Sequence, residues 1–185
     1  MKIILASNSP RRKELLTALG YDFEVGFVDC DEIYPADLSV EKIAEYLSEL
    51  KADAFRTLEE NEILITADTI VAVGAEVLGK PEDAIHAKEM LRKLSGKTHQ
   101  VYTGITIRNS ENTISKTDVA HVEIGELTDT EIDFYIENYK PFDKAGAYGV
   151  QEWFGMAKIN RITGSYYTVM GLPTHLVYGI LKDLE

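Results

Sequence analysis

The sequence predicts a mixed α/β fold, in which helices flank a β-sheet. Short apolar runs that suit buried strands alternate with longer segments whose apolar residues recur at helical spacing. A strand, a tight polar loop and a helix open the chain, which is the order of a βα unit. A hairpin and a segment rich in Gly and Tyr interrupt the alternation, so a simple doubly wound sheet is not expected.

The first predicted strand and helix lie on either side of a short polar turn. Residues 2–6 (KIILA) form an apolar run, and residues 7–10 (SNSP) have turn chemistry. A helix is predicted over residues 11–19, because Ser9 suits its N-cap and Gly20 suits its C-terminal cap. A loop of this kind presents backbone N–H groups and favours anions.

The next elements are two helices with a strong strand between them. A helix is predicted from residue 40 to about residue 58, with Ser39 as its cap. Residues 63–68 (ILITAD) form an apolar run that ends on a carboxylate, and residues 69–73 continue it as extended chain. Residues 82–94 carry apolar side chains at helical spacing, so a helix is predicted there.

The rest of the chain is predicted to contain a hairpin and two helices. β-rich runs at residues 98–108 and 113–124 lie on either side of a polar turn. Helices are predicted over residues 129–138 and 173–184. Residues 139–171 are rich in Gly and Tyr and are predicted to form loops and short strands.

Composition indicates one folded domain without a membrane span. The chain has 185 residues, of which 45% are apolar. It has no apolar run of about 18 residues, the length that a membrane helix needs, and its N-terminal apolar run is too short for a signal peptide. Cys30 is the only cysteine, so no internal disulfide forms and a cytoplasmic location is expected.

The charge balance limits the kinds of ligand that the protein binds. The formal net charge is −12, which argues against nucleic-acid binding through a broad basic surface. An anionic ligand therefore needs a local cluster of Lys and Arg, or a divalent metal ion. Arg11 and Arg12 form such a cluster at a helix N-terminus, where the helix dipole disfavours cations but guanidinium groups beside N–H donors suit a polyphosphate. The alternative is a pair of solvated arginines on the surface.

Asp68 is the most conspicuous carboxylate, because it ends a buried strand. Ligands of α/β proteins bind at the carboxyl ends of strands, so three roles are open: metal ligand, general base, or cap of a turn. Asp31, Glu32 and Glu49 are further carboxylates that could share a divalent ion. Mg²⁺ takes few protein carboxylates and keeps substrate phosphates among its ligands.

Residues 74–81 (GAEVLGKP) come close to the phosphate-binding P-loop pattern but end differently. The pattern needs Ser or Thr after the lysine, and Pro81 supplies neither a hydroxyl nor an N–H group. The middle residues suit the return strand of a hairpin, and Pro81 is expected to begin the following helix. Lys80 can still reach a phosphate as a point charge.

Residues 143–151 (DKAGAYGVQ) indicate close approach of backbone to a ligand or to another part of the chain. Their two glycines suit this approach, and a strained turn explains them equally well. The amide of Gln151 can pair with the edge of a base.

Taken together and in order, these segments resemble the Maf family of nucleoside triphosphate pyrophosphatases. The matching motifs extend over essentially the whole chain: residues 5–12, 67–71, 79–81, 94–104, 143–151 and 164–173. The resemblance implies a fold like that of the inosine triphosphate pyrophosphatases, as one Maf-like domain over residues 1–185 with a mixed sheet, two lobes and a central cleft. It also implies a homodimer.

The resemblance implies hydrolysis of a nucleoside triphosphate to the monophosphate and pyrophosphate, as a house-cleaning activity. Asp68 matches the proton acceptor of the family. Arg11, Thr69 and Gln151 match the positions tied to base choice, in the pattern of the branch that acts on dTTP and UTP, with modified pyrimidine nucleotides as further candidates. The other matching substrate contacts are Ser7, Arg12, Glu32, Lys51 and Lys80. Glu152 departs from the family, which usually has Gly there, and is expected to reshape the rim of the cleft.

The residues and the resemblance agree on metal-assisted hydrolysis of a phosphoanhydride. Mg²⁺ or Mn²⁺ would be held by Asp68 and Glu32, and the basic residues would stabilise charge on the phosphates and on the leaving pyrophosphate. Whether Asp68 acts as a base directly or through the metal ion is left open. The alternative is a non-enzymatic, nucleotide-binding regulator of cell division, for which an acidic surface would suit a protein partner.

Overall fold

The computed structural model describes residues 2–184 as two compact units. Unit 1 contains residues 2–69, 103–118 and 171–184, and unit 2 contains residues 70–102 and 119–170. The elements in chain order are β1 (Lys2–Leu5), α1 (Pro10–Ala18), β2 (Phe23–Val25), α2 (Val40–Asp53), β3 (Glu62–Val73), β4 (Glu76–Leu78), α3 (Ala84–Leu94), β5 (Thr98–Arg108), β6 (Thr113–Ile124), α4 (Asp129–Tyr139), the 3₁₀ turn η1 (Ala145–Ala147), α5 (Trp153–Lys158), β7 (Ile159–Thr163), α6 (Tyr166–Met170) and α7 (Thr174–Leu184).

The strands form a mixed sheet, which confirms the predicted fold class. The strand order is β2-β1-β3-β5-β6-β7, and β4 pairs with β3. β1 runs parallel to both of its neighbours, with Ile3 opposite Phe23 on β2 and opposite Ile63 on β3. β4 returns antiparallel along β3, with Val71 opposite Leu78, so the hairpin predicted for residues 74–81 is present.

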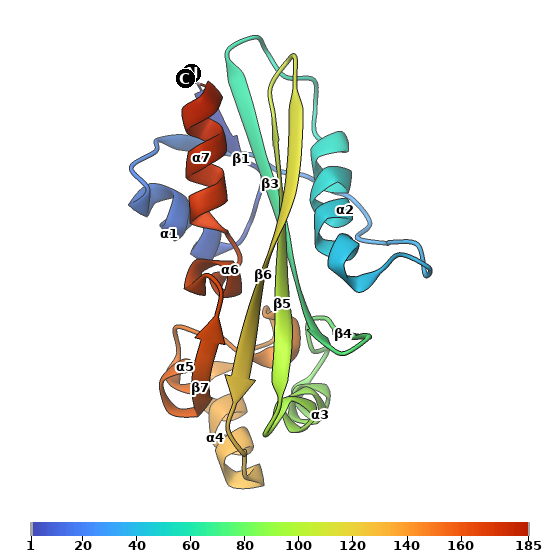
Figure 1. Ribbon diagram of the computed structural model, residues 1–185, viewed down its shortest axis with the longest axis vertical. Helices are drawn as coiled ribbons and strands as arrows, with labels where there is room; N and C mark the ends of the chain where they lie inside the picture. Colours follow the sequence, from blue (N-terminus) through green and yellow to red (C-terminus); the bar gives the residue numbers. More distant parts are fainter. Residues whose placement is uncertain (1, 185) are drawn as a thin grey trace. The chain divides into compact units, whose positions relative to one another are not determined.

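In unit 1, helix α2 packs closely against β3 and β5. A Cβ atom on Gly104 of β5 would lie 2.2 Å from the Ala44 carbonyl oxygen, so only glycine allows this approach. The buried hydroxyl of Ser48 lies 2.8 Å from that of Thr106, and the hydroxyl of Thr66 donates to the Ser48 carbonyl oxygen at 2.7 Å. Figure 1 shows α2 on one side of these strands and α1 with α7 on the other. These contacts fix α2 along β3.

Two predicted helix boundaries are wrong. α2 ends at Asp53 and not near residue 58, because Phe55 and Leu58 pack from outside the helix against a buried cluster that includes Ile4. α3 begins at Ala84, so Pro81 does not start it, and the Asp83 side chain caps it by accepting from the His86 N–H at 2.8 Å.

The segment of residues 139–171 has more regular structure than predicted. β7 is one of the expected short strands, but α5 and α6 are helices of 6 and 5 residues. Helices this short contain too few turns to show an apolar periodicity in the sequence. Within residues 2–184, the helices all lack the combined length and hydrophobicity that crossing a membrane requires.

In unit 2, a buried histidine packs beneath the loop of residues 143–151. His99 is fully buried, and its Nε2 lies 2.8 Å from the hydroxyl of Tyr148. Nδ1 of His99 has no hydrogen-bond partner among the described residues. Burial therefore lowers the pKa of His99 to about 4.

His99 should make the fold sensitive to acid. The unfolded chain takes up a proton near the ordinary histidine pKa of about 6.5, whereas folded His99 does so only near 4. His99 therefore has no effect on the free energy of unfolding above pH 7. As the pH drops below 6.5 it lowers that free energy, by about 2.5 kcal/mol at pH 4.5. Urea unfolding at pH 7 and pH 4.5 should show this loss, and His99→Gln should remove most of it. Equal losses in the two proteins would contradict the assignment.

Candidate active site

Unit 1 brings three of the predicted site residues together around one ammonium group. Lys51 Nζ lies 2.5 Å from Asp68 Oδ1 and 3.0 Å from Glu32 Oε1. The side chains of Asp68 and Lys51 are only 10% and 12% exposed, whereas that of Glu32 is 49% exposed. The pair of Asp68 and Lys51 is therefore mostly buried, and Glu32 lies on its side that faces solvent.

The packing of α2 on β3 explains why Lys51 meets Asp68. Ser48 of α2 contacts Thr66 of β3. Lys51 lies three residues after Ser48, so it shares the same face of the helix. Asp68 lies two residues after Thr66, so it shares the same face of the strand. One buried contact thus sets the register that places the lysine against the carboxylate.

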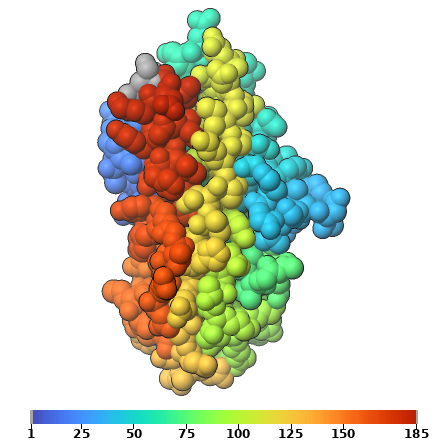
Figure 2. Space-filling view, viewed as in Figure 1, coloured from blue at the N-terminus to red at the C-terminus, as the bar shows by residue number. Residues whose placement is uncertain are grey.

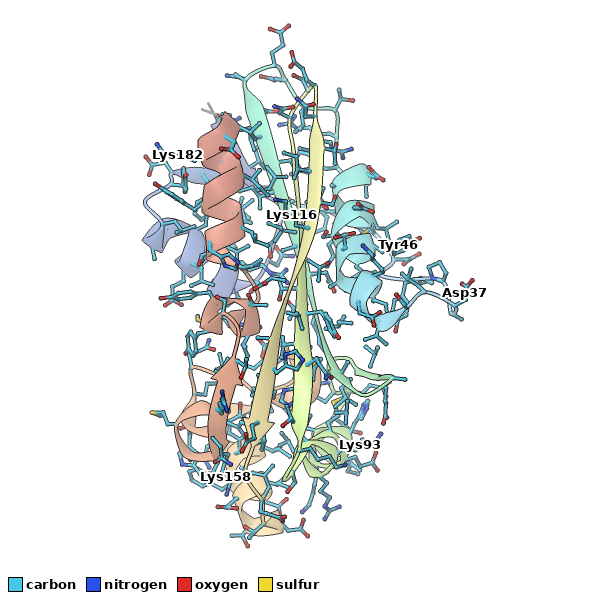
Figure 3. The ribbon with its side chains drawn as sticks, in the orientation of Figure 1. Asp37, Tyr46, Lys93, Lys116, Lys158 and Lys182 are labelled. Atoms are coloured by element: carbon cyan, nitrogen blue, oxygen red, sulfur yellow. The ribbon has the colours of Figure 1, made fainter. Side chains whose placement is uncertain are left out.

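Glu32 comes from the long segment between β2 and α2. This segment projects away from the unit 1 strands, with Asp37 at its tip (Figure 3). In the space-filling view the same light-blue region stands out from the surface beside α2 (Figure 2). Because Glu32 is linked to Lys51, the middle of the segment is held at the candidate site.

The guanidinium group of Arg12 is bound by oxygen atoms of the protein. Nε donates to the Gly171 carbonyl oxygen at 2.8 Å, and Nη1 donates to the Ala67 carbonyl oxygen at 2.8 Å. Nη1 also lies 3.4 Å from Ser7 Oγ, and Nη2 donates to Thr69 Oγ1 at 3.1 Å. Arg12 therefore holds the residues on both sides of Asp68. Burial lowers the pKa of Arg12, and the charge of Asp68 opposes that shift.

The hydroxyl of Thr69 has a fixed orientation. Thr69 Oγ1 accepts from Arg12 and lies 2.9 Å from Thr103 Oγ1, to which it can donate. Gly171 has φ of +102°, and a Cβ atom there would lie 3.2 Å from Thr69 Oγ1. The sequence did not single out Thr103 or the role of Gly171, because neither belongs to a motif that indicates a contact with β3.

The loop before α1 uses its own serines as hydrogen-bond acceptors. The Ser9 N–H donates to Ser7 Oγ at 3.2 Å, and the Arg12 N–H donates to Ser9 Oγ at 3.5 Å. Ser9 is therefore the N-cap, as predicted. Arg11 is half-buried in the first turn of α1, which contains no acidic residue. Phosphate binding by Ser7 and Arg11 stays a prediction.

Unit 2 carries the other two predicted contacts, Lys80 and Gln151, and both are exposed. The turn that contains Lys80 is tied to the loop of residues 143–151, because the Gly146 N–H donates to the Gly79 carbonyl oxygen at 3.0 Å. Gly146 has φ of +70°, and a Cβ atom there would lie 2.9 Å from a Val71 methyl group. The two segments are therefore packed together within unit 2.

The carboxylates of Asp68 and Glu32 suit a divalent cation with phosphate ligands. Both bind one ammonium group, so they already converge on a single positive charge. Mg²⁺ commonly takes one or two protein carboxylates and completes its shell with substrate phosphates and water. Among residues 2–184, no group of three or more His, Cys, Asp or Glu side chains is arranged to hold a metal ion. A metal ion here would therefore need further ligands from outside these side chains, such as water or phosphate oxygens.

Comparison with known proteins shows relatives that are similar to this chain over nearly its whole length. A dTTP/UTP pyrophosphatase of Bacteroides thetaiotaomicron is 54% identical, over 99% of this chain and 96% of that protein. Proteins of the same name from Porphyromonas gingivalis and Flavobacterium johnsoniae are 50% and 48% identical, over 98% and 99% of this chain and 94% and 95% of theirs.

One solved structure has a similar fold, and a family model matches the chain. The structure of a HAM1 protein from Coxiella burnetii resembles this chain with a TM-score of 0.51 over 99% of both chains, at 14% sequence identity, which shows a shared fold alone. The family model described as Maf-like protein matches residues 2–184. The chain therefore belongs to the Maf family.

Proposed function

We propose that the protein hydrolyses dTTP and UTP, and modified pyrimidine triphosphates of similar shape, to the monophosphate and pyrophosphate. The observation that carries the proposal is the buried pair of Asp68 and Lys51, held by Arg12, in a chain whose relatives are dTTP/UTP pyrophosphatases. A carboxylate fixed beside a lysine offers a base next to a positive charge, as hydrolysis of a phosphoanhydride requires.

In the proposed reaction, water attacks the triphosphate and the anhydride bond that links the α-phosphate to the rest breaks. Asp68 accepts a proton from the water, and pyrophosphate leaves with the electron pair of the broken bond. Lys51 orients Asp68 and supports negative charge on the phosphates. Arg12 acts at this point mainly by fixing the backbone on both sides of Asp68.

We propose that Mg²⁺ or Mn²⁺ is the cofactor, held by Asp68 and Glu32. The bound ion would neutralise charge on the triphosphate and help to orient it. The convergence of both carboxylates on Lys51 supports this proposal.

The remaining contacts are proposed from the family resemblance. Arg11 and Lys80 would bind phosphate oxygens, and Ser7 would support the same loop as Arg12. Arg11, Thr69 and Gln151 would contribute to base choice. The homodimer also stays a proposal, and light scattering of the purified protein would test it.

The function is tested by the products that the protein releases from dTTP with Mg²⁺. We expect pyrophosphate and dTMP in equal amounts, and loss of both when a chelator removes the metal ion. Release of single phosphate groups would contradict the proposed bond cleavage. A folded protein that binds dTTP without turnover would favour the nucleotide-binding regulator instead. Activity that persists unchanged in chelator would overturn the metal proposal alone.

A further inference from the structure

Gln151 occupies a tight turn at the end of the loop of residues 143–151. The turn consists of residues 149–152 and is closed by the Glu152 N–H, which donates to the Gly149 carbonyl oxygen at 3.2 Å. Gln151 is the third residue of this turn, and its side chain is exposed. The conformation of the turn therefore sets the position from which the Gln151 amide reaches a ligand.

One buried hydroxyl group joins the two ends of this turn. The Gly149 N–H donates to the hydroxyl of Tyr135 at 2.9 Å, and the same hydroxyl donates to Glu152 Oε2. Tyr135 lies on α4, is fully buried and contacts the rings of Tyr139 and Phe154. A rigid aromatic ring thus anchors the hydroxyl, and the hydroxyl anchors both the first and the last residue of the turn.

A lysine completes the arrangement on the other side of the carboxylate. Lys144 Nζ lies 3.2 Å from Glu152 Oε1 and 2.7 Å from Asp143 Oδ1, and the Lys144 side chain is only 9% exposed. Gly149 makes room for the carboxylate, because a Cβ atom there would lie 2.7 Å from the carboxyl carbon of Glu152. A second charged contact therefore links the turn to the start of the same loop.

The carboxylate of Glu152 is not used as a helix cap. Glu152 is the N-cap residue of α5, yet its side chain makes no capping hydrogen bond to that helix. It turns instead towards Tyr135 and Lys144. The Glu152 side chain is therefore held by tertiary contacts and not by its own helix. These contacts hold the turn of residues 149–152 in one conformation.

We propose that Glu152 is a positioning residue for base selectivity, which acts by holding the turn that presents Gln151. The proposal rests on the function proposed above, in which Gln151 contacts the base. Holding a contact group in its binding conformation removes the ordering cost of binding. Loosening the turn should therefore weaken the binding of UTP and narrow the preference for UTP over GTP, while the chemistry at Asp68 continues.

Three variants test the proposal through kcat and KM for UTP and GTP. Glu152→Ala removes both buried contacts, Tyr135→Phe removes only the hydroxyl that joins the turn, and Glu152→Gln keeps an acceptor for Tyr135. We expect Glu152→Ala and Tyr135→Phe to raise the KM for UTP about fivefold, with kcat within about twofold of wild type. Their UTP-to-GTP ratio of kcat/KM should fall by a similar factor, and Glu152→Gln should recover most of the loss.

Tyr139→Phe serves as the matched control, because it removes a hydroxyl from the ring stacked on Tyr135 and leaves the contacts of Glu152 intact. It should behave as wild type. Gln151→Ala provides the reference, since it removes the amide itself. If Glu152→Ala does not fold, as judged by thermal unfolding, Tyr135→Phe carries the test.

The outcomes separate the two proposals. Suppose that Gln151→Ala changes the selectivity, while Tyr135→Phe and Glu152→Ala both keep the wild-type KM and selectivity. This result overturns the role of Glu152 alone. Unchanged selectivity in Gln151→Ala overturns the reading of the base by Gln151, and the role of Glu152 with it. Absence of UTP hydrolysis by the wild-type protein overturns the proposed function itself.

Discussion

Asp68→Asn should lower kcat for dTTP and UTP by about 10²-fold or more, because an amide cannot take the proton of the attacking water. The variant should still fold, since asparagine has the same shape and its amide oxygen can still accept from Lys51 at the position of Oδ1. An amide is also a weaker ligand for Mg²⁺ than a carboxylate, so the metal ion, and dTTP with it, should bind less tightly. Steady-state kinetics with a pyrophosphate readout, together with dTTP binding measured by calorimetry, check both parts of the prediction.

Asp53→Asn is the matched control for Asp68→Asn. Asp53 also lies in unit 1 and pairs with a basic residue, Arg108, at 3.0 Å, but its side chain is 75% exposed. The same chemical change there should alter kcat by less than about twofold, because exposed ion pairs contribute little. A folded Asp68→Asn protein that turns over dTTP at nearly the wild-type rate would remove Asp68 from its proposed role.

Local sequence patterns were sufficient to predict most of the strands and helices. The apolar run of residues 2–6, followed by Ser9 and Pro10, predicts β1 and α1 because a strand, a cap and a helix start are encoded by neighbouring residues. The hairpin of β5 and β6 also has the predicted bounds, because its two strands and the polar turn between them are neighbours in the sequence. The predicted end of α2 failed because a distant contact decides it: the helix ends where Phe55 joins the core around Ile4. The predicted start of α3 failed because Asp83, and not Pro81, begins the helix as its cap.

The contacts within the candidate site depend on residues that are far apart in the sequence. Asp68 was predicted as a site residue from its place on the strand, but its pairing with Lys51 depends on how α2 packs along β3. The partner of Arg12 at Gly171 is separated from it by 159 residues. No periodicity or spacing rule reaches that far, so the sequence did not indicate the four protein oxygens around Arg12. Its predicted contact with the substrate stays a prediction.

Arg12→Lys should be nearly as damaging as Arg12→Ala, although lysine keeps the positive charge. A single ammonium group cannot reproduce the planar guanidinium, which binds oxygens of Gly171, Ala67 and Thr69 in three directions. Buried carbonyl oxygens left without donors cost about 1–3 kcal/mol each, so the unfolding temperature should fall by several degrees. The backbone around Asp68 should also shift, and misplacement on the scale of 1 Å can lower the rate up to about 10²-fold.

The kinetics of Arg12→Lys distinguish positioning from direct phosphate binding. If Arg12 positions Asp68, its replacement by lysine should lower kcat by about 10- to 100-fold at saturating dTTP, with little change in KM. If Arg12 only binds phosphate, its replacement should raise KM instead. Lysine should then restore part of the binding as a point charge. Arg108→Lys is the control, because Arg108 also lies in unit 1 but pairs with exposed Asp53, and its kinetics should match wild type. Wild-type kcat and unfolding temperature in Arg12→Lys would show that the four oxygens do not need the guanidinium, and the network around Asp68 would then have to be held by α2 and Lys51 alone.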